Sequence, residues 1–347
     1  MIKKIFAFTL ALLFVLNTAA FADTKKPKVR KTANQTNRLV ALLPASDGVV
    51  FLDVQRLLNE ALPQILAANP PKLNEINEQI DQIKARTGFD VRQFEQIAVG
   101  VTLKQTAASK TTVEPVILAR GKYNSDALLT LAKIALKGKY REEKVGSKAV
   151  YIFAAREILT ENKSRFTGNS MLKILDFLLK KMPSEIAVTS LNANTLAIGS
   201  IARVRETVEN KARVGADIAL LLNRKPNSIM SFAAKTPVGL SQFFDLDDDA
   251  LGQSLAAIRQ IYGAVNLSGE NIVATLSAKS LNAEQGKSLE ETLGGMQALI
   301  RAFLSSARSD EKQVYARIVE GAKITRVGTE VTIDLQVANT DAALLIK

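Results

Sequence analysis

The sequence of 347 residues contains no histidine, no cysteine and no tryptophan. Without histidine there is no Ser-His-Asp triad, and without cysteine there is neither a thiol nucleophile nor a disulfide. The usual zinc sites, which are built from these two residue types, are excluded for the same reason. The fold must therefore be held by burial of apolar side chains, and pairs of Asp and Glu stay available for acid–base chemistry.

Aromatic residues are also scarce, at 5% of the chain. Proteins that bind single-stranded nucleic acid stack bases on aromatic side chains, so this scarcity argues against such a platform. Hydrophobic residues make up 47% and charged residues 23%, which is the composition of a globular protein. We therefore expect a folded protein without a nucleic-acid partner, although its net charge is +12.

The first 22 residues have the pattern of a secretory signal peptide. Lys3 and Lys4 form a basic start, an apolar stretch follows over residues 5–16, and Ala20-Phe21-Ala22 supplies small residues before the predicted cleavage. An uncleaved anchor is the alternative, but polar residues interrupt the stretch, and a membrane span needs about 20 apolar residues. We expect an exported protein, either periplasmic or secreted.

Much of the positive charge lies near the start of the chain. Residues 1–38 contain eight of the 46 lysine and arginine residues and a single acid, Asp23. From Asp23 to Arg38 the sequence is polar and lacks an apolar period, which predicts a disordered basic arm. Its candidate surface-binding residues are Lys25, Lys26, Lys28, Arg30 and Lys31. Each would contribute about 1 kcal/mol beside an anionic membrane surface; a solvated leader is the alternative interpretation.

The rest of the chain alternates short β-branched runs with amphipathic segments joined by short turns. This pattern favours antiparallel α+β layers over a parallel βαβ fold. We expect strands over residues 48–54, 96–103, 113–120, 149–153, 186–191, 195–198, 228–233, 261–267 and 271–278, and a hairpin over 323–337. We expect helices over residues 55–68, 72–86, 124–137, 171–182, 201–210, 249–260, 283–306 and 311–321.

Two short motifs recur with one and the same separation along the sequence. Leu43-Pro44 precedes one expected strand, and Lys225-Pro226 precedes another. Val145-Gly146-Ser147 corresponds in the same way to Val327-Gly328-Thr329. The stretches between these motifs match only with gaps, so a coincidence of layout is the alternative to duplication. The predicted fold class is α+β, with duplicated blocks of antiparallel sheet and packed helices. The predicted domains are a signal peptide over 1–22, a basic disordered arm over 23–38, and α+β blocks over 39–222 and 223–347.

Part of the first block has a recognisable pattern. The run from Leu43-Pro44 to Val54, followed by Thr87-Gly88-Phe89-Asp90 and Ile97-Ala98-Val99-Gly100, resembles a group of exported bacterial proteins of unknown function with repeated α+β blocks. The resemblance covers roughly residues 39–205. It implies a fold and a location outside the cytoplasm, and it brings no activity and no catalytic residue.

The densest acidic cluster is Asp245-Leu246-Asp247-Asp248-Asp249, in which Asp245, Asp247 and Asp249 are candidate metal ligands. A calcium loop of the EF-hand type needs glycine at its sixth position and glutamate at its twelfth. Ala250 and Ala256 occupy these positions. The alternative interpretation is that the carboxylates cap the helix expected over 249–260.

Two of the predicted helices can each be interpreted in more than one way from the sequence. Gly294-Gly295 interrupts the helix expected over 283–306 and costs about 2 kcal/mol relative to two alanines. Close packing against a strand would explain these glycines, and so would a hinge or a ligand groove. The helix expected over 171–182 is the most apolar one, which indicates burial between the blocks or contact with lipid or a partner.

These observations lead to two hypotheses on function. The first is an exported envelope protein that binds or scaffolds without catalysis and without a cofactor. Its partner would be another envelope protein, an apolar ligand held between the blocks, or an anionic membrane surface. The alternative is an extracytoplasmic hydrolase that uses paired carboxylates, assisted by a divalent metal near Asp245–Asp249.

Overall fold

The structure, a computed structural model, describes residues 38–105, 111–135, 138–154, 184–236, 250–305 and 308–346. Several predicted features lie outside these residues: the signal peptide, almost all of the basic arm with Lys25, Lys26, Lys28, Arg30 and Lys31, the helix expected over 171–182, and Asp245, Asp247 and Asp249. They stay predictions.

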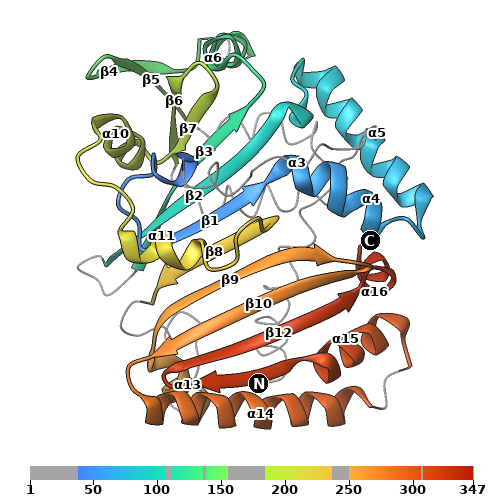
Figure 1. Ribbon diagram of the computed structural model, residues 1–347. Coiled ribbons are helices and arrows are strands. Elements are labelled where there is room, and N and C mark those ends of the chain that lie inside the picture. The colour runs from blue at the N-terminus through green and yellow to red at the C-terminus, as the bar shows by residue number, and fades with distance from the viewer. Residues whose placement is uncertain are drawn as a thin grey trace. The chain divides into compact units, whose positions relative to one another are not determined.

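The chain forms two compact units (Figure 1). The N-terminal unit consists of the described parts of Pro27–Gln55 and Gln79–Ala219, and the C-terminal unit of Arg56–Glu78 and the described parts of Leu220–Lys347. The predicted blocks are continuous in sequence, whereas the segment Arg56–Glu78 belongs with the C-terminal unit. The exact block boundaries stay a prediction.

The N-terminal unit contains an antiparallel sheet with the strand order β1-β2-β3-β7-β6-β5-β4. Its strands are β1 (Gly48–Asp53), β2 (Phe94–Gln105), β3 (Thr111–Gly121), β4 (Arg141–Val145), β5 (Lys148–Ala154), β6 (Glu185–Asn192) and β7 (Thr195–Gly199). Its helices are α6 (Ser125–Ala135) and α10 (Ile201–Glu209), with a 3-10 turn over Val91–Gln93. Leu129 of α6 packs on Ile186, Val188 and Leu196 and thereby covers part of the sheet.

The C-terminal unit contains an antiparallel sheet with the order β11-β12-β10-β9-β8. Its strands are β8 (Met230–Lys235), β9 (Ile258–Ser268), β10 (Asn271–Ser280), β11 (Lys323–Val327) and β12 (Glu330–Ala338). Its helices are a π-turn (Leu57–Ala61), α4 (Leu62–Ile65), α13 (Ala250–Ala256), α14 (Ala283–Leu304), α15 (Asp310–Gly321) and α16 (Asn339–Leu345). Helices α3 (Val54–Arg56), α5 (Pro70–Thr87) and α11 (Ala216–Leu222) lie where the chain changes unit.

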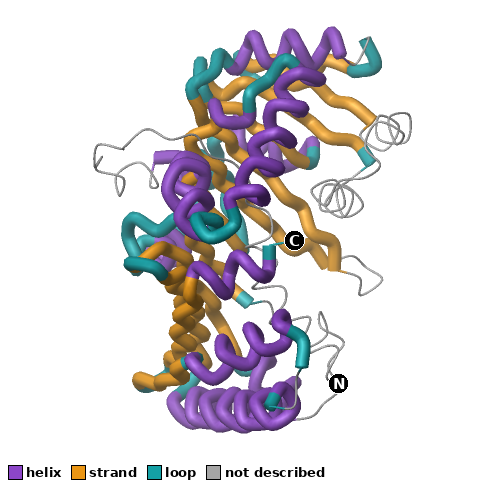
Figure 2. The backbone as a smooth tube through the Cα atoms, turned by 90° about the vertical axis from the view of Figure 1, so that its right-hand side faces the viewer, coloured by secondary structure: helices purple, strands orange, loops and turns teal. Residues whose placement is uncertain are grey.

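The sheet of the C-terminal unit has one apolar and one polar face, because successive side chains of a strand point to opposite sides. Leu255 of α13 and Leu289 of α14 pack with Val331 of β12 in the core on the apolar face. Figure 2 shows α14 and α15, at the foot of the view, on one side of the strands of this unit. Among the helices that the structure describes, none combines the length and apolar character needed to cross a bilayer.

Most of the predicted elements are confirmed, including both turns at Asn192-Ala193-Asn194 and Ser268-Gly269. One prediction is wrong: the helix expected over 249–260 ends at Ala256, and β9 begins at Ile258. The reason is that Ile258 joins the apolar core and pairs with Ser280 of β10, so tertiary pairing ends the helix early. Sequence analysis also missed β4, α11 and α16.

The two units share a strand plan, which supports the duplication hypothesis. Two pairs of strands are separated by the same number of positions. Strand β8 starts at Met230 where β1 starts at Gly48, and β11 starts at Lys323 where β4 starts at Arg141. In the N-terminal unit the hairpin β6–β7 lies between β3 and β5, whereas β12 pairs directly with β10 in the C-terminal unit. The repeated Val-Gly motif forms the turn of the β4–β5 hairpin in the N-terminal unit and of the β11–β12 hairpin in the C-terminal unit.

The glycines of these two turns adopt nearly the same left-handed backbone. Gly146 has φ of 58° and Gly328 has φ of 61°. Glycine adopts this region without the steric cost that a Cβ imposes on other residues. The repeated Val-Gly motif therefore marks a position where the backbone requires glycine.

The pair Gly294-Gly295 lies inside α14, which continues through it. A Cβ added at either position would meet no atom within 4 Å. The interpretation that close packing requires these glycines is therefore wrong, and the hinge or groove interpretation stays a hypothesis. Gly286 of the same helix differs, since a Cβ there would lie 3.0 Å from the backbone oxygen of Gly328.

We predict that Gly294→Ala and Gly295→Ala each raise the free energy of unfolding by about 0.5–1 kcal/mol, because alanine restricts the unfolded chain and favours the helix. Urea unfolding of each variant measures the change. Gly286→Ala is the matched control and should give no gain, since its Cβ would press on the β11–β12 turn. A loss of stability at Gly294 or Gly295 would contradict this account.

Candidate functional site

The C-terminal unit carries a polar pocket with a volume of about 240 Å³. Three strands of the sheet form its floor, and the end of α11 with the turn after it forms a wall. The floor residues are Tyr262, Gly263 and Ala264 of β9, Thr275 and Ser277 of β10, and Glu330, Thr332 and Asp334 of β12. The wall residues are Leu221, Leu222, Arg224 and Lys225.

Strand register brings the floor side chains together. Ser277 pairs with Tyr262 on one side and with Thr332 on the other. Two residues away, Thr275 pairs in the same way with Asp334 of β12. Because the side-chain period of a strand is two, these rows lie on one face, opposite the apolar core. The pocket is thus built on the polar face of the sheet.

Arg224 links the wall to the floor. Its Nη1 lies 2.9 Å from Oε2 and 3.0 Å from Oε1 of Glu330, and it also donates a hydrogen bond to the hydroxyl of Tyr262. Its guanidinium carbon lies 4.8 Å from the centre of the Tyr262 ring, a cation–π arrangement. The ion pair is half-exposed, so it contributes at most about 1 kcal/mol to stability, and its main effect is to orient the two side chains.

The other floor residues form two hydroxyl contacts. The Thr275 hydroxyl donates to Oδ1 of Asp334 at 2.7 Å, and the hydroxyls of Ser277 and Thr332 are hydrogen-bonded at 2.8 Å. A hydroxyl both donates and accepts, and a carboxylate accepts several hydrogen bonds, so each group keeps capacity for a further partner. The pocket therefore offers donors and acceptors close together.

Tyr262 is 5% exposed at the bottom of the pocket. Burial raises the pKa of its phenol to about 12, and a hydrogen bond with Glu330 raises it too, while Ser277 and Arg224 partly offset the rise. The phenol is therefore neutral at physiological pH, and it is hydrogen-bonded to Glu330 and accepts from Arg224.

The raised pKa of Tyr262 predicts a loss of stability at high pH. Between pH 10 and pH 12 an unfolded chain releases the phenol proton while the folded unit keeps it, so the free energy of unfolding falls as pH rises. Urea unfolding across this window should show a smaller fall for Tyr262→Phe than for the wild-type protein. An identical fall of the free energy of unfolding in both proteins would show that the pKa of Tyr262 is not raised in the folded unit.

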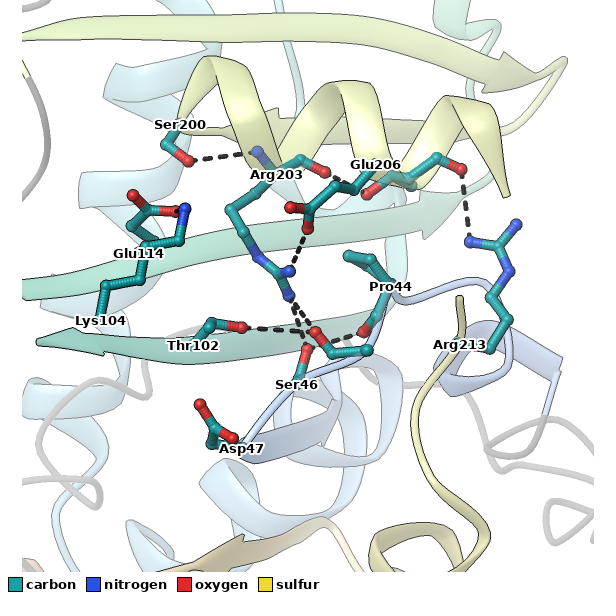
Figure 3. Close-up of polar contacts among 12 residues, drawn as sticks. Pro44, Ser46, Asp47, Thr102, Lys104, Glu114, Ser200, Arg203, Glu206 and Arg213 are labelled. Carbon is teal, nitrogen blue, oxygen red and sulfur yellow. Dashed lines mark hydrogen bonds and ion pairs between the residues drawn. The ribbon is translucent and has the colours of Figure 1, made fainter. Parts of the chain in front are cut away.

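A second polar cluster lies in the N-terminal unit, around Arg203 of α10 (Figure 3). Arg203 is only 3% exposed. Its Nη2 donates to the backbone oxygen of Ala45 and to Oγ of Ser46, both at 2.8 Å, and its Nη1 pairs with Glu206. Ser200 caps the same helix by accepting from the backbone N–H of Arg203 at 3.3 Å.

These contacts fix the segment before β1. Arg213 adds a hydrogen bond from Nη1 to the backbone oxygen of Leu42 at 2.6 Å. Ser46 packs so closely on Gly100 of β2 that a Cβ there would lie 2.6 Å from its Oγ. Because most donors of the Arg203 guanidinium are used within the chain, we interpret this cluster as a structural clamp and not as a ligand site.

The C-terminal unit has an equivalent of this clamp. Pro44-Ala45-Ser46 precedes β1, and Pro226-Asn227-Ser228 stands at the corresponding position before β8. Arg56 donates to the backbone oxygen of Asn227, as Arg203 does to that of Ala45. An arginine therefore holds the middle carbonyl of the same Pro-X-Ser motif in both units, although the two arginines come from different places in the sequence.

We predict that Arg203→Ala lowers the free energy of unfolding by about 2–4 kcal/mol, because it removes a buried side chain that donates to both Ala45 and Ser46. Arg205→Ala on the same helix is the matched control. Arg205 pairs with Glu143 on the surface, so its loss should cost less than about 1 kcal/mol. Equal effects of the two variants in urea unfolding would refute the clamp.

The structure does not bring the sequence-predicted candidates into a site. Within the described ranges, no three Asp or Glu side chains are placed to hold a metal ion together. Asp245, Asp247 and Asp249 and the five basic arm residues lie outside these ranges. Sequence analysis missed the pocket residues, whose only signal is the alternation of polar side chains at Thr275 and Ser277 and at Glu330, Thr332 and Asp334.

Comparison with known proteins adds little to this geometry. No family model matches the chain, and no curated protein matches it. Among solved structures, crystal form I of TP0453 is similar with 12% identity and a TM-score of 0.42, over 89% of this chain and 96% of that chain. Crystal form III of TP0453 is similar with 12% identity and a TM-score of 0.44, over 88% and 96%. Similarity at this level carries no conclusion on function.

Proposed function

We propose that the protein is an exported envelope protein that binds a small polar molecule in the pocket of its C-terminal unit and does not transform it. Export rests on the signal-peptide pattern of the first 22 residues. Binding rests on the pocket. The observation that supports it most is that both carboxylate side chains of the pocket are already fixed by contacts within the chain. Arg224 holds Glu330, and Thr275 holds Asp334.

The spacing of these two carboxylates argues against the hydrolase alternative at this pocket. Glu330 and Asp334 lie four residues apart on β12. At about 3.3 Å per residue, their Cα atoms are about 13 Å apart. Glycosidases place their two carboxyl groups about 5–9.5 Å apart, so this pair would need to lean far toward each other to act on one bond. Binding without reaction therefore fits the geometry better.

The lining of this pocket favours a polar ligand over an apolar one, which is one of the three candidate partners from sequence and was expected between the blocks. Seven of the twelve lining residues carry a hydroxyl, carboxylate or guanidinium group, and an apolar molecule would bury the remaining hydrogen-bonding capacity of these groups. The basic arm and the anionic membrane surface stay a separate hypothesis, since they concern residues 23–38. They would place the protein near the membrane without changing the chemistry of the pocket.

Native mass spectrometry of the mature protein, from Asp23, tests the proposal. Protein purified from an exporting host without denaturation should carry a small molecule that unfolding releases. Arg224→Ala should lose it, because the variant removes a wall of the pocket. Arg317→Ala is the matched control, since this arginine is equally exposed and also pairs with a carboxylate, but lies on α15 outside the pocket. Wild-type protein without any released molecule would contradict the proposal.

A further inference from the structure

The pocket has balanced charge, which restricts the chemistry of its ligand. Two cations, Arg224 and Lys225, face two carboxylates, Glu330 and Asp334. An anionic ligand would meet the carboxylates, and a cationic ligand would meet Arg224 and Lys225. In each case a charged ligand lies beside two side chains of its own charge, which disfavours binding.

The existing contacts also disfavour a zwitterion at the pair of Arg224 and Glu330. Both oxygens of Glu330 are engaged by Nη1 of Arg224, so an ammonium beside Glu330 or a carboxylate beside Arg224 would have to compete with that ion pair. A hydroxyl group does not have to compete. It donates to Asp334, which accepts only one hydrogen bond within the part of the chain described, and it accepts from Lys225, which has no carboxylate partner there.

The size of the pocket limits the ligand further. Its volume of about 240 Å³ equals that of about eight liquid waters and lies below the range of drug-sized sites. A single sugar ring with hydroxyls around its edge fits this volume. Such a molecule presents several donors and acceptors in fixed directions, which matches the close spacing of donors and acceptors on the floor.

We infer that the pocket binds a neutral, multiply hydroxylated small molecule of monosaccharide size. Its hydroxyls donate to Asp334 and accept from Lys225, while the pair of Arg224 and Glu330 stays intact. This inference rests on the proposed function and names the ligand class of the same site.

Amide chemical shifts of the isotope-labelled mature protein test the inference. The probes are D-glucose, D-galactose and N-acetyl-D-glucosamine, with glycine as the zwitterion and inorganic phosphate as the anion. At least one sugar should shift the amides of Gly263, Ala264 and Thr275 saturably, whereas glycine and phosphate should not. Asp334→Asn should weaken sugar binding at least about tenfold, because it removes a charged acceptor. Asp341→Asn, outside the pocket on α16, is the matched control and should leave it unchanged.

The two proposals fail in different ways. If glycine or phosphate shifts these amides saturably and no sugar does, the ligand class is wrong while binding at the pocket stands. If none of the probes shifts them, the inference is overturned, and an absence of released molecule in native mass spectra would then overturn the proposed function as well. Sugar binding that survives in Asp334→Asn would overturn the role of Asp334.

Discussion

The division of the C-terminal sheet into an apolar and a polar face is the constraint on which the candidate site depends. The chain has no cysteine, so no disulfide holds this sheet, and Leu255 and Leu289 of the helices must be buried against Val331 of the sheet. Covering one face fixes the strand register, since a slip by one residue would turn the apolar side chains outward. The same register places Tyr262, Ser277 and Thr332 in one row on the opposite face. The core thus determines the floor of the pocket.

A second constraint acts where each unit's first strand begins. The motif Pro-X-Ser precedes both β1 and β8, and in each case an arginine from a distant segment donates to its middle carbonyl. A backbone carbonyl accepts hydrogen bonds, and one arginine can donate to several acceptors at once. Arg203 comes from α10 and Arg56 from the segment after β1, so the two units meet the same requirement with different residues. The shared strand plan and this shared requirement support a common origin of the units.

The fold was largely predictable because its signals are local. Short runs of apolar, often β-branched residues mark β1, β9 and β10, and the glycines of the β4–β5 and β11–β12 turns stand at equivalent places in the two units. Strand β4 was missed because its sequence, Arg141 to Val145, is almost entirely charged, as suits a strand at the sheet edge. The pocket was not predictable. Arg224, Tyr262 and Glu330 are far apart in sequence, and polar alternation on β12 is equally typical of a solvated sheet face without a site.

The central claim is that the polar face of the C-terminal unit holds a small hydroxylated molecule without breaking the contacts already present. The most direct measurement is the electron density of the pocket in crystals of the mature protein soaked in turn with the three monosaccharides. The account predicts continuous ring density, with sugar hydroxyls at about 2.6–3.2 Å from Asp334 and Lys225 and the pair of Arg224 and Glu330 intact. Separate water peaks in every soak, or a ligand that displaces Arg224 from Glu330, would contradict it.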